Sequence, residues 1–261
     1  MDKKDKFRSC LIGGAVGDAL GYAVEFCSED RIFAQYGKDG ITDYALSNGV
    51  AIVSDDTQMT MFTATALLDG ITRGNMRGIM GSFESYIALE YIGWYLTQTA
   101  PFPVDRDEYY AKYSWIMNAP RLFQRRAPGN TCLSALSMGG NGTLEEPINN
   151  SKGCGGIMRV APIGLYFANG NYDKMPQTDI DLIGAKAAAI THGHELGYIP
   201  AAAIVHIINL LAKNDNISVL DAVTDSVVVM RKIFNHSEHL EYFHRLMEKA
   251  GTFKNEYSLE N

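Results

Sequence analysis

The sequence predicts an all-α protein, a compact multi-helix bundle with long functional loops. Two observations lead to this expectation. Apolar residues recur at helical spacing over most of the chain, and no convincing pair of strands with a hairpin turn stands out. With 261 residues, of which 46% are hydrophobic and 20% charged, the chain is long enough to bury a sizeable core. We expect residues 1–261 to form a single domain.

The predicted helices differ in how clearly the sequence marks them. Residues 7–23 are apolar but rich in glycine, and each interior glycine costs about 1 kcal/mol relative to alanine, which suggests a packing or functional reason. Residues 55–69 form the clearest amphipathic helix, with Ser54 as a natural N-cap and Gly70 as a natural stop. Further helices are expected at 80–97, shortly after 127–131, and at 157–168, 180–191, 196–213, 218–234 and 237–249.

Two loops interrupt this helical pattern. Prolines and charges mark residues 100–108 as a loop, and residues 139–156 form a longer one that is rich in glycine and asparagine. A loop of that length within a compact domain is usually functional or disordered.

Composition excludes some partners. The formal net charge of -7 argues against a sequence-independent grip on nucleic acid, although a local loop can still bind a small anion. No stretch approaches the roughly 20 apolar residues of a membrane span, and the charged N-terminus does not resemble a signal peptide. The four cysteines are scattered, without zinc-site spacing, so we expect reduced thiols in a cytoplasmic protein.

The first candidate motif is the run Ser54-Asp55-Asp56-Thr57. Four consecutive oxygen-bearing side chains offer hard ligands for Mg²⁺ or Mn²⁺. Adjacent helical residues point about 100° apart, so two neighbouring carboxylates share a site most easily at a helix start. The alternative is an ordinary N-cap followed by two aspartates that suit the positive end of the helix dipole.

The second candidate pairs Asp18 with Glu25. They are seven residues apart, which places them on roughly the same helical face, in a segment that is otherwise apolar and glycine-rich. An unpaired charge there is expensive, so either a paired or metal-linked role or a solvated helix edge accounts for them.

Two further segments carry polar groups at helix starts. In residues 151–159, a glycine-rich turn that runs into a helix can present backbone N–H groups to a phosphate; the alternative is a flexible turn with Arg159 in an ion pair. In residues 191–195, His192 and His194 would diverge on a helix and are poor joint metal ligands there. On an extended turn, one of the two histidines could contact a ligand. Polar residues at a helix junction are the simpler explanation of that spacing.

Together, five segments in order resemble the ADP-ribosylglycohydrolase family, which includes the enzyme that reactivates dinitrogenase reductase. The resemblance covers roughly residues 9–213. The segments are GGAVGDALGYAVEF, VSDDTQMT, APGNTCLSAL, SKGCGGIMRVAPIGL and ITHGHELGYIPAAAIVHIINLL.

The resemblance implies an all-α fold and a centre of two metal ions, Mg²⁺ or Mn²⁺, in an ADP-ribose cleft. It implies metal ligation by Ser54, Asp55 and Asp56, and catalytic roles for Glu25, Asp55 and Asp56. It also implies substrate binding by the phosphate loop and by the histidine of a Thr-His element, that is, by Ser151, Gly153, Cys154, Gly155, Gly156 and His192.

The chain departs from the family pattern near its C-terminus. The family closes its metal site with an Asp-x-Asp-Thr motif, and nothing after residue 200 resembles it. The two Asp-x-Asp patterns, at 105–107 and 179–181, are in the wrong place and are followed by the wrong residue. We therefore expect a C-terminally shortened domain that binds metal weakly at no more than one site, has low or no activity, and self-associates through its truncated face.

The implied function is metal-dependent hydrolysis of the bond at ribose C1″, which removes ADP-ribose from an ADP-ribosylated protein or small molecule. One alternative is a catalytically impaired ADP-ribose-binding or structural relative that lacks half of the metal site. Another is a metal-dependent phosphohydrolase. Release of free ADP-ribose, rather than inorganic phosphate or AMP, separates the two enzymatic alternatives.

Overall fold

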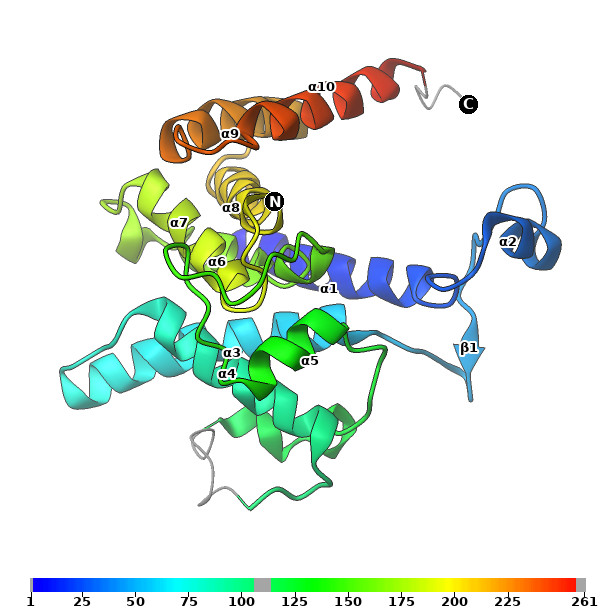
Figure 1. Ribbon diagram of the computed structural model, residues 1–261, viewed down its shortest axis with the longest axis horizontal. Helices are drawn as coiled ribbons and strands as arrows, with labels where there is room; N and C mark the ends of the chain where they lie inside the picture. Colours follow the sequence, from blue (N-terminus) through cyan, green and yellow to red (C-terminus); the bar gives the residue numbers. More distant parts are fainter. Residues whose placement is uncertain (1, 106–113, 257–261) are drawn as a thin grey trace. The chain divides into compact units, whose positions relative to one another are not determined.

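The computed structural model describes residues 2–105 and 114–256 (Figure 1). Within them lie ten α-helices, a few short 3₁₀ turns and one two-stranded hairpin, which confirms the all-α expectation. The chain divides into two compact units, residues 1–140 and 141–261. The second half of the predicted 100–108 loop lies outside the described residues.

The first unit contains five of the α-helices. The packed pair α3 and α4 forms its core, where Met59, Phe62, Ile87 and Trp94 are fully buried. Burying a side chain of this size stabilises a fold by about 1.5–3 kcal/mol. The elements are α1 (Lys3–Gly21), α2 (Glu29–Tyr36), β1 (Leu46–Ser47), β2 (Val50–Ala51), α3 (Asp55–Arg77), α4 (Phe83–Thr99), η3 (Trp115–Asn118), η4 (Pro120–Leu122) and α5 (Asn130–Ser137).

Helix α3 is longer than predicted, because Gly70 does not stop it. A Cβ atom on Gly70 would lie only 3.0 Å from the Cδ2 atom of Tyr86, so this glycine lets α4 approach closely. The helix continues to Arg77 and ends at Gly78, whose φ of 69° is the left-handed conformation of a glycine C-cap. The stop signal is therefore real but lies eight residues further along the chain.

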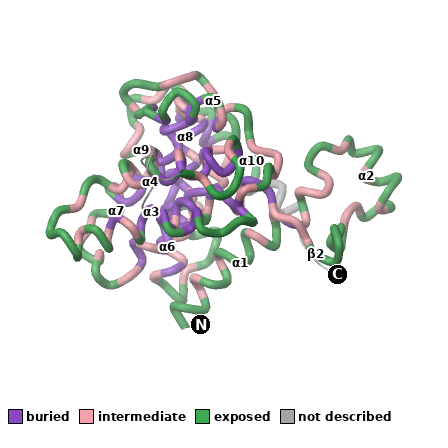
Figure 2. The backbone as a smooth tube through the Cα atoms, turned by 90° about the horizontal axis from the view of Figure 1, so that it is seen from below, coloured by how far each residue is buried: buried purple, intermediate pink, exposed green. Residues whose placement is uncertain are grey.

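Two elements between α1 and α3 were not predicted. The hairpin β1–β2 turns at Asn48 and Gly49, whose φ values of 51° and 78° are those of an asparagine-glycine hairpin turn. The expectation of no strand pair was wrong here, because strands of two residues are too short to show alternation. Helix α2, which Ser28 caps, has no buried residue (Figure 2).

The second unit is built around α8. This helix packs against α6, α7 and α9, and its Ala201, Ala202 and Val205 are fully buried. The elements are η5 (Cys154–Gly156), α6 (Ala161–Tyr166), η6 (Gly170–Tyr172), α7 (Gln177–Ala189), α8 (Glu195–Lys213), α9 (Val219–Ile233) and α10 (Leu240–Glu256). By length and composition alone α8 could cross a membrane, but half of its apolar window is buried against these neighbours, as in the core helix of a globular unit.

Helix α6 is shorter than the predicted 157–168. It begins at Ala161 and has Pro162 in its first turn. Proline has no N–H, and its ring collides with the carbonyl four residues earlier, so an α-helix cannot run from residue 157 through Pro162 without a break.

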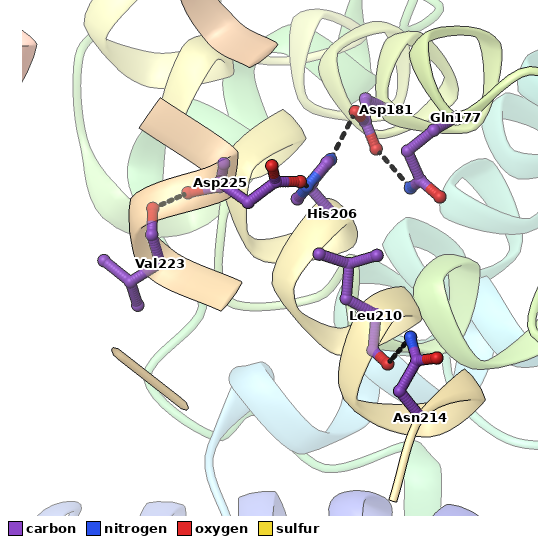
Figure 3. Close-up of polar contacts among 8 residues, drawn as sticks. Gln177, Asp181, His206, Leu210, Asn214, Val223 and Asp225 are labelled. Atoms are coloured by element: carbon purple, nitrogen blue, oxygen red, sulfur yellow. Dashed lines mark hydrogen bonds and ion pairs between the residues drawn. The ribbon is translucent and has the colours of Figure 1, made fainter. Parts of the chain in front are cut away.

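An aspartate–histidine–aspartate bridge joins three helices of this unit (Figure 3). His206 of α8 lies with Nδ1 2.8 Å from Oδ2 of Asp181 on α7 and with Nε2 2.9 Å from Oδ2 of Asp225 on α9. Gln177 donates a further hydrogen bond of 2.9 Å to Asp181. Burial disfavours the charged imidazole, but the two carboxylates outweigh it and raise the pKa of His206. The bridge therefore favours the protonated imidazole, while burial still raises the pKa of Asp181 against the effect of His206.

Candidate active site

The acidic motif lies at the start of α3, as predicted. Ser54 is the N-cap, and its Oγ accepts a hydrogen bond of 3.1 Å from the Asp56 N–H. Asp18, in the last turn of α1, supplies a second cap. Its carboxylate accepts hydrogen bonds from the Ser54 N–H, at 2.9 and 3.0 Å, and from the Thr57 N–H and hydroxyl. Asp18 thus ties the end of α1 to the start of α3.

Asp55 is held from the other side by the segment before α5. Its N–H donates to the Arg126 carbonyl at 2.9 Å, and its Oδ2 accepts from the Gly129 N–H at 3.1 Å. The side chain is 5% exposed. The sequence predicted only a turn at 127–131, so the contact between Gly129 and Asp55 is a feature that sequence reasoning missed.

The charges around these carboxylates are all negative. Burial raises the pKa of Asp55 to about 7. The hydrogen bond from the Gly129 N–H lowers this pKa, and the charge of Asp56 raises it further. Burial and the charges of Asp18 and Glu25 raise the pKa of Asp56 to about 6. Among the described residues, no lysine or arginine forms an ion pair with this group. A cation placed here would relieve both the repulsion and the burial penalty.

The structure corrects the placement of Glu25. Helix α1 ends at Gly21, so Glu25 lies in the following turn and does not share a helical face with Asp18. Its side chain is exposed, yet its charge still acts on Asp55 and Asp56, and partial burial together with Asp18 raises its own pKa. The structure therefore brings Glu25, Asp55 and Asp56 into one electrostatic cluster, which we call the acidic cluster.

The acidic cluster suits a hard divalent cation in its chemistry but supplies only part of a coordination shell. Ser54, Asp55 and Asp56 offer oxygen donors in sequence at one helix start. The carboxylate oxygens of Asp18, in contrast, accept hydrogen bonds that cap α3. Within the part of the chain that the structure describes, no three acidic, histidine or cysteine side chains converge closely enough to hold a metal. Water or further groups would complete the shell.

In the second unit, one side chain holds the glycine-rich loop in place. Oδ1 of Asn149 accepts from the Ser151 and Gly193 N–H groups at 3.0 and 3.2 Å, and its Nδ2 donates to the Thr191 carbonyl at 2.8 Å. A Cβ atom on Gly193 would lie 2.3 Å from the Asn149 carbonyl oxygen, so this close approach requires glycine. The loop is therefore anchored to the turn between α7 and α8.

Four of the five predicted loop residues, Ser151 among them, lie at the surface or near it, and one does not. Gly153 and Cys154 are exposed and Gly155 is half-buried. Gly156 is buried, and a Cβ atom there would lie 2.9 Å from the Ala188 Cβ. Close packing of the loop against α7 therefore accounts for Gly156, whereas the outer loop is accessible to a ligand.

His192 lies beside this loop, and His194 does not join it in a metal site. His192 is 2% exposed and sits in the turn after α7. His194 is the N-cap of α8, where its Nδ1 accepts from the Leu196 N–H, and its ring stacks on His239 with the centroids 4.5 Å apart. The helical spacing argument does not apply to this pair, because His192 lies in the turn and His194 caps α8.

The family comparison decides what kind of protein carries these features. Residues 1–257 match the ADP-ribosylglycohydrolase family. This chain belongs to that family. The ADP-ribosylglycohydrolases are hydrolases that act on ADP-ribosylated substrates and generally depend on divalent metals.

A curated relative is an archaeal protein described as uncharacterized. This protein of Archaeoglobus fulgidus is 27% identical over 169 residues, which are 63% of this chain and 44% of the relative. The chain therefore matches less than half of the length of that relative.

Proposed function

We propose that this chain hydrolyses the bond at ribose C1″ and so releases ADP-ribose from an ADP-ribosylated protein or small molecule. The observation that carries the proposal is the acidic cluster, in which the buried Asp55 lies beside the half-buried Asp56 and the exposed Glu25, at a helix start that Asp18 and Gly129 hold in place. Such an arrangement costs stability, and a cationic ligand at the site offsets that cost. The same cysteine composition that suggested a reducing compartment leads us to propose a cytoplasmic location.

In this proposal Ser54, Asp55 and Asp56 hold Mg²⁺ or Mn²⁺ through their oxygens. A bound divalent ion would supply Lewis acidity and orient the ribose hydroxyls. Glu25, the exposed member of the acidic cluster, takes the proton of the attacking water as the water oxygen bonds to C1″. The bond from C1″ to the target atom breaks, and that atom leaves with the proton that Glu25 took from the water. The glycine-rich loop at 151–156 binds phosphate through its N–H groups.

The test is release of free ADP-ribose from mono-ADP-ribosylated protein, with arginine-linked and serine-linked substrates assayed separately. We expect turnover with Mg²⁺ or Mn²⁺ and none in EDTA. Asp55→Asn should lower turnover by about 100-fold or more, the scale of losing a catalytic carboxylate. Asp30→Asn is the matched control, since Asp30 also lies in the first turn of a helix but is exposed on α2.

Three outcomes separate the alternatives. Metal-dependent release that Asp55→Asn abolishes supports the proposal. Binding of ADP-ribose without release favours the catalytically impaired binding relative. Release of inorganic phosphate or AMP in place of ADP-ribose favours a phosphohydrolase and contradicts the proposal.

A further inference from the structure

A buried chain of hydrogen bonds runs from Arg159 to His192. The Arg159 side chain is fully buried, and its Nη2 donates to the Ala187 carbonyl at 3.1 Å and to the Thr191 hydroxyl at 2.7 Å. The same hydroxyl oxygen lies 2.8 Å from Nδ1 of His192. Thr191 is fully buried and His192 nearly so. Neither Arg159 nor Thr191 has a role in the proposed function, and both connect to His192, for which the family resemblance implies substrate binding.

The chemistry of the three groups fixes the direction of each bond. A guanidinium has only donors, so the Thr191 oxygen must accept from Arg159. The single hydroxyl proton of Thr191 then needs an acceptor, because a buried donor without one is costly. Nδ1 of His192 is the acceptor at hydrogen-bond distance. When the hydroxyl donates to it, Nδ1 carries no proton, and the proton of the neutral ring resides on Nε2.

The charge around His192 also favours the neutral ring. Burial, together with the positive charge of Arg159, lowers the pKa of His192 to about 4. The imidazole therefore stays neutral at physiological pH and presents one donor, Nε2–H, together with one acceptor, Nδ1.

Nε2 faces the outer part of the glycine-rich loop. A Cβ atom built on Gly153 would lie 3.5 Å from Nε2 of His192 and 3.6 Å from the Ser151 hydroxyl oxygen. Gly153 itself is exposed. The space that this missing side chain leaves is thus open to a ligand and is bordered by the imidazole N–H and a serine hydroxyl.

We propose that Arg159, acting through Thr191, is a positioning residue that locks His192 as a neutral Nε2–H donor, directed at an acceptor oxygen bound above Gly153. The inference rests on the proposed function for the identity of that ligand, ADP-ribose, whose hydroxyl and phosphate oxygens can both accept. A ligand group that only donates, such as an ammonium, is rejected there because it would meet another donor.

Nitrogen–proton NMR correlation of the His192 ring in the full, ligand-free chain tests the lock directly. We expect the Nε2–H tautomer in the unsubstituted protein. Thr191→Val keeps the shape of the side chain but removes the hydroxyl, and it should give a mixture of tautomers. Thr191→Ser retains the hydroxyl and should restore the Nε2–H form. An Nδ1–H form or an imidazolium at neutral pH in the unsubstituted protein, or an unchanged tautomer in Thr191→Val, would overturn the proposal.

Titration with ADP-ribose tests the direction of the donor. Thr191→Val should weaken binding by about fivefold to tenfold, the effect of one lost hydrogen bond, and Thr191→Ser should recover it. Titration with ADP, which lacks the terminal ribose, distinguishes the acceptors: a matching loss with ADP assigns a phosphate oxygen, and a loss confined to ADP-ribose assigns a ribose oxygen.

Gly153→Ala guards against the possibility that Thr191→Val fails to fold. The added methyl group makes only ordinary contacts, so the variant should fold and keep the Nε2–H tautomer, yet it should weaken ADP-ribose binding by at least the same factor. Full affinity in Gly153→Ala would contradict the proposal. If the unsubstituted chain binds no ADP-ribose, the proposed function fails, and the NMR result still decides for or against the lock.

Discussion

Asp55 in the first unit and Asp181 in the second are both buried aspartates, with exposed fractions of 5% and 0%, but the charges beside them have opposite signs. Asp181 faces the His206 imidazole, which Asp225 holds from its other side. Asp55 faces Asp56 and Glu25. The comparison teaches that burial alone does not mark a functional carboxylate. The mark is burial without a compensating cation, because such a carboxylate has a raised pKa and gains from binding a cation.

The largest effect should follow from breaking the aspartate–histidine–aspartate bridge around His206. Asp181→Ala leaves His206 buried without its inner carboxylate, so we expect the free energy of unfolding to fall by about 3–5 kcal/mol. Urea denaturation measures the change. Asp179→Ala is the control, since Asp179 is exposed on the same helix and should shift stability by less than about 0.5 kcal/mol. Equal losses in the two variants would show that the bridge contributes nothing.

The acidic cluster should respond to a cation instead. At a Mg²⁺ or Mn²⁺ concentration 100-fold above its dissociation constant, binding to the folded state should raise the free energy of unfolding by about 2.7 kcal/mol. Thermal unfolding in EDTA and in excess metal measures this difference. Asp55→Asn should lose most of it, whereas Asp30→Asn should keep it. If Asp55→Asn and the unsubstituted chain responded identically to metal, the acidic cluster would not be the metal-binding site.

A smaller effect should appear in the pH dependence of stability. Because the folded pKa of His206 is raised above its ordinary value of 6.5, its contribution is fully present below that pH and is lost as the pH rises through the folded pKa. The loss should be about 1.4 kcal/mol for each unit by which the pKa is raised. Urea denaturation at a series of pH values from below 6.5 upward measures this loss. In His206→Gln the loss should be absent. A component that survives in His206→Gln would belong to another group.

Local signals predicted the starts of α3, α8 and α9 to within one residue, but those of α1, α4, α6, α7 and α10 were off by three or four residues. Ser54 was identified as the cap of α3 because a serine followed by two aspartates is a sequence pattern with its own hydrogen bond. The stop at Gly70 and the helical placement of Glu25 were wrong, because packing against Tyr86 and the end of α1 at Gly21 decide them. The Asn48-Gly49 pair is a sequence signal for a hairpin turn, and the hairpin there was not predicted.

Contacts distant in sequence were beyond the reach of pattern analysis. The Gly129 N–H reaches Asp55 across 74 positions, and Arg159 reaches Thr191 across 32. Neither pairing leaves a spacing or a periodicity in the sequence, since both depend on how helices meet. The sequence gives no sign of the role of His206 for the same reason, and only the packing of α7 and α9 on α8 reveals its two carboxylate partners.

The amide of Asn149 has a consequence for how strongly the loop can hold a ligand. By engaging Ser151, Gly193 and Thr191 at once, this side chain fixes the loop geometry before any ligand arrives. Ordering the backbone of a free loop costs about 1–2 kcal/mol per residue, and that entropy is lost here during folding. An incoming anion therefore meets N–H groups already in place, so more of its interaction energy goes into affinity.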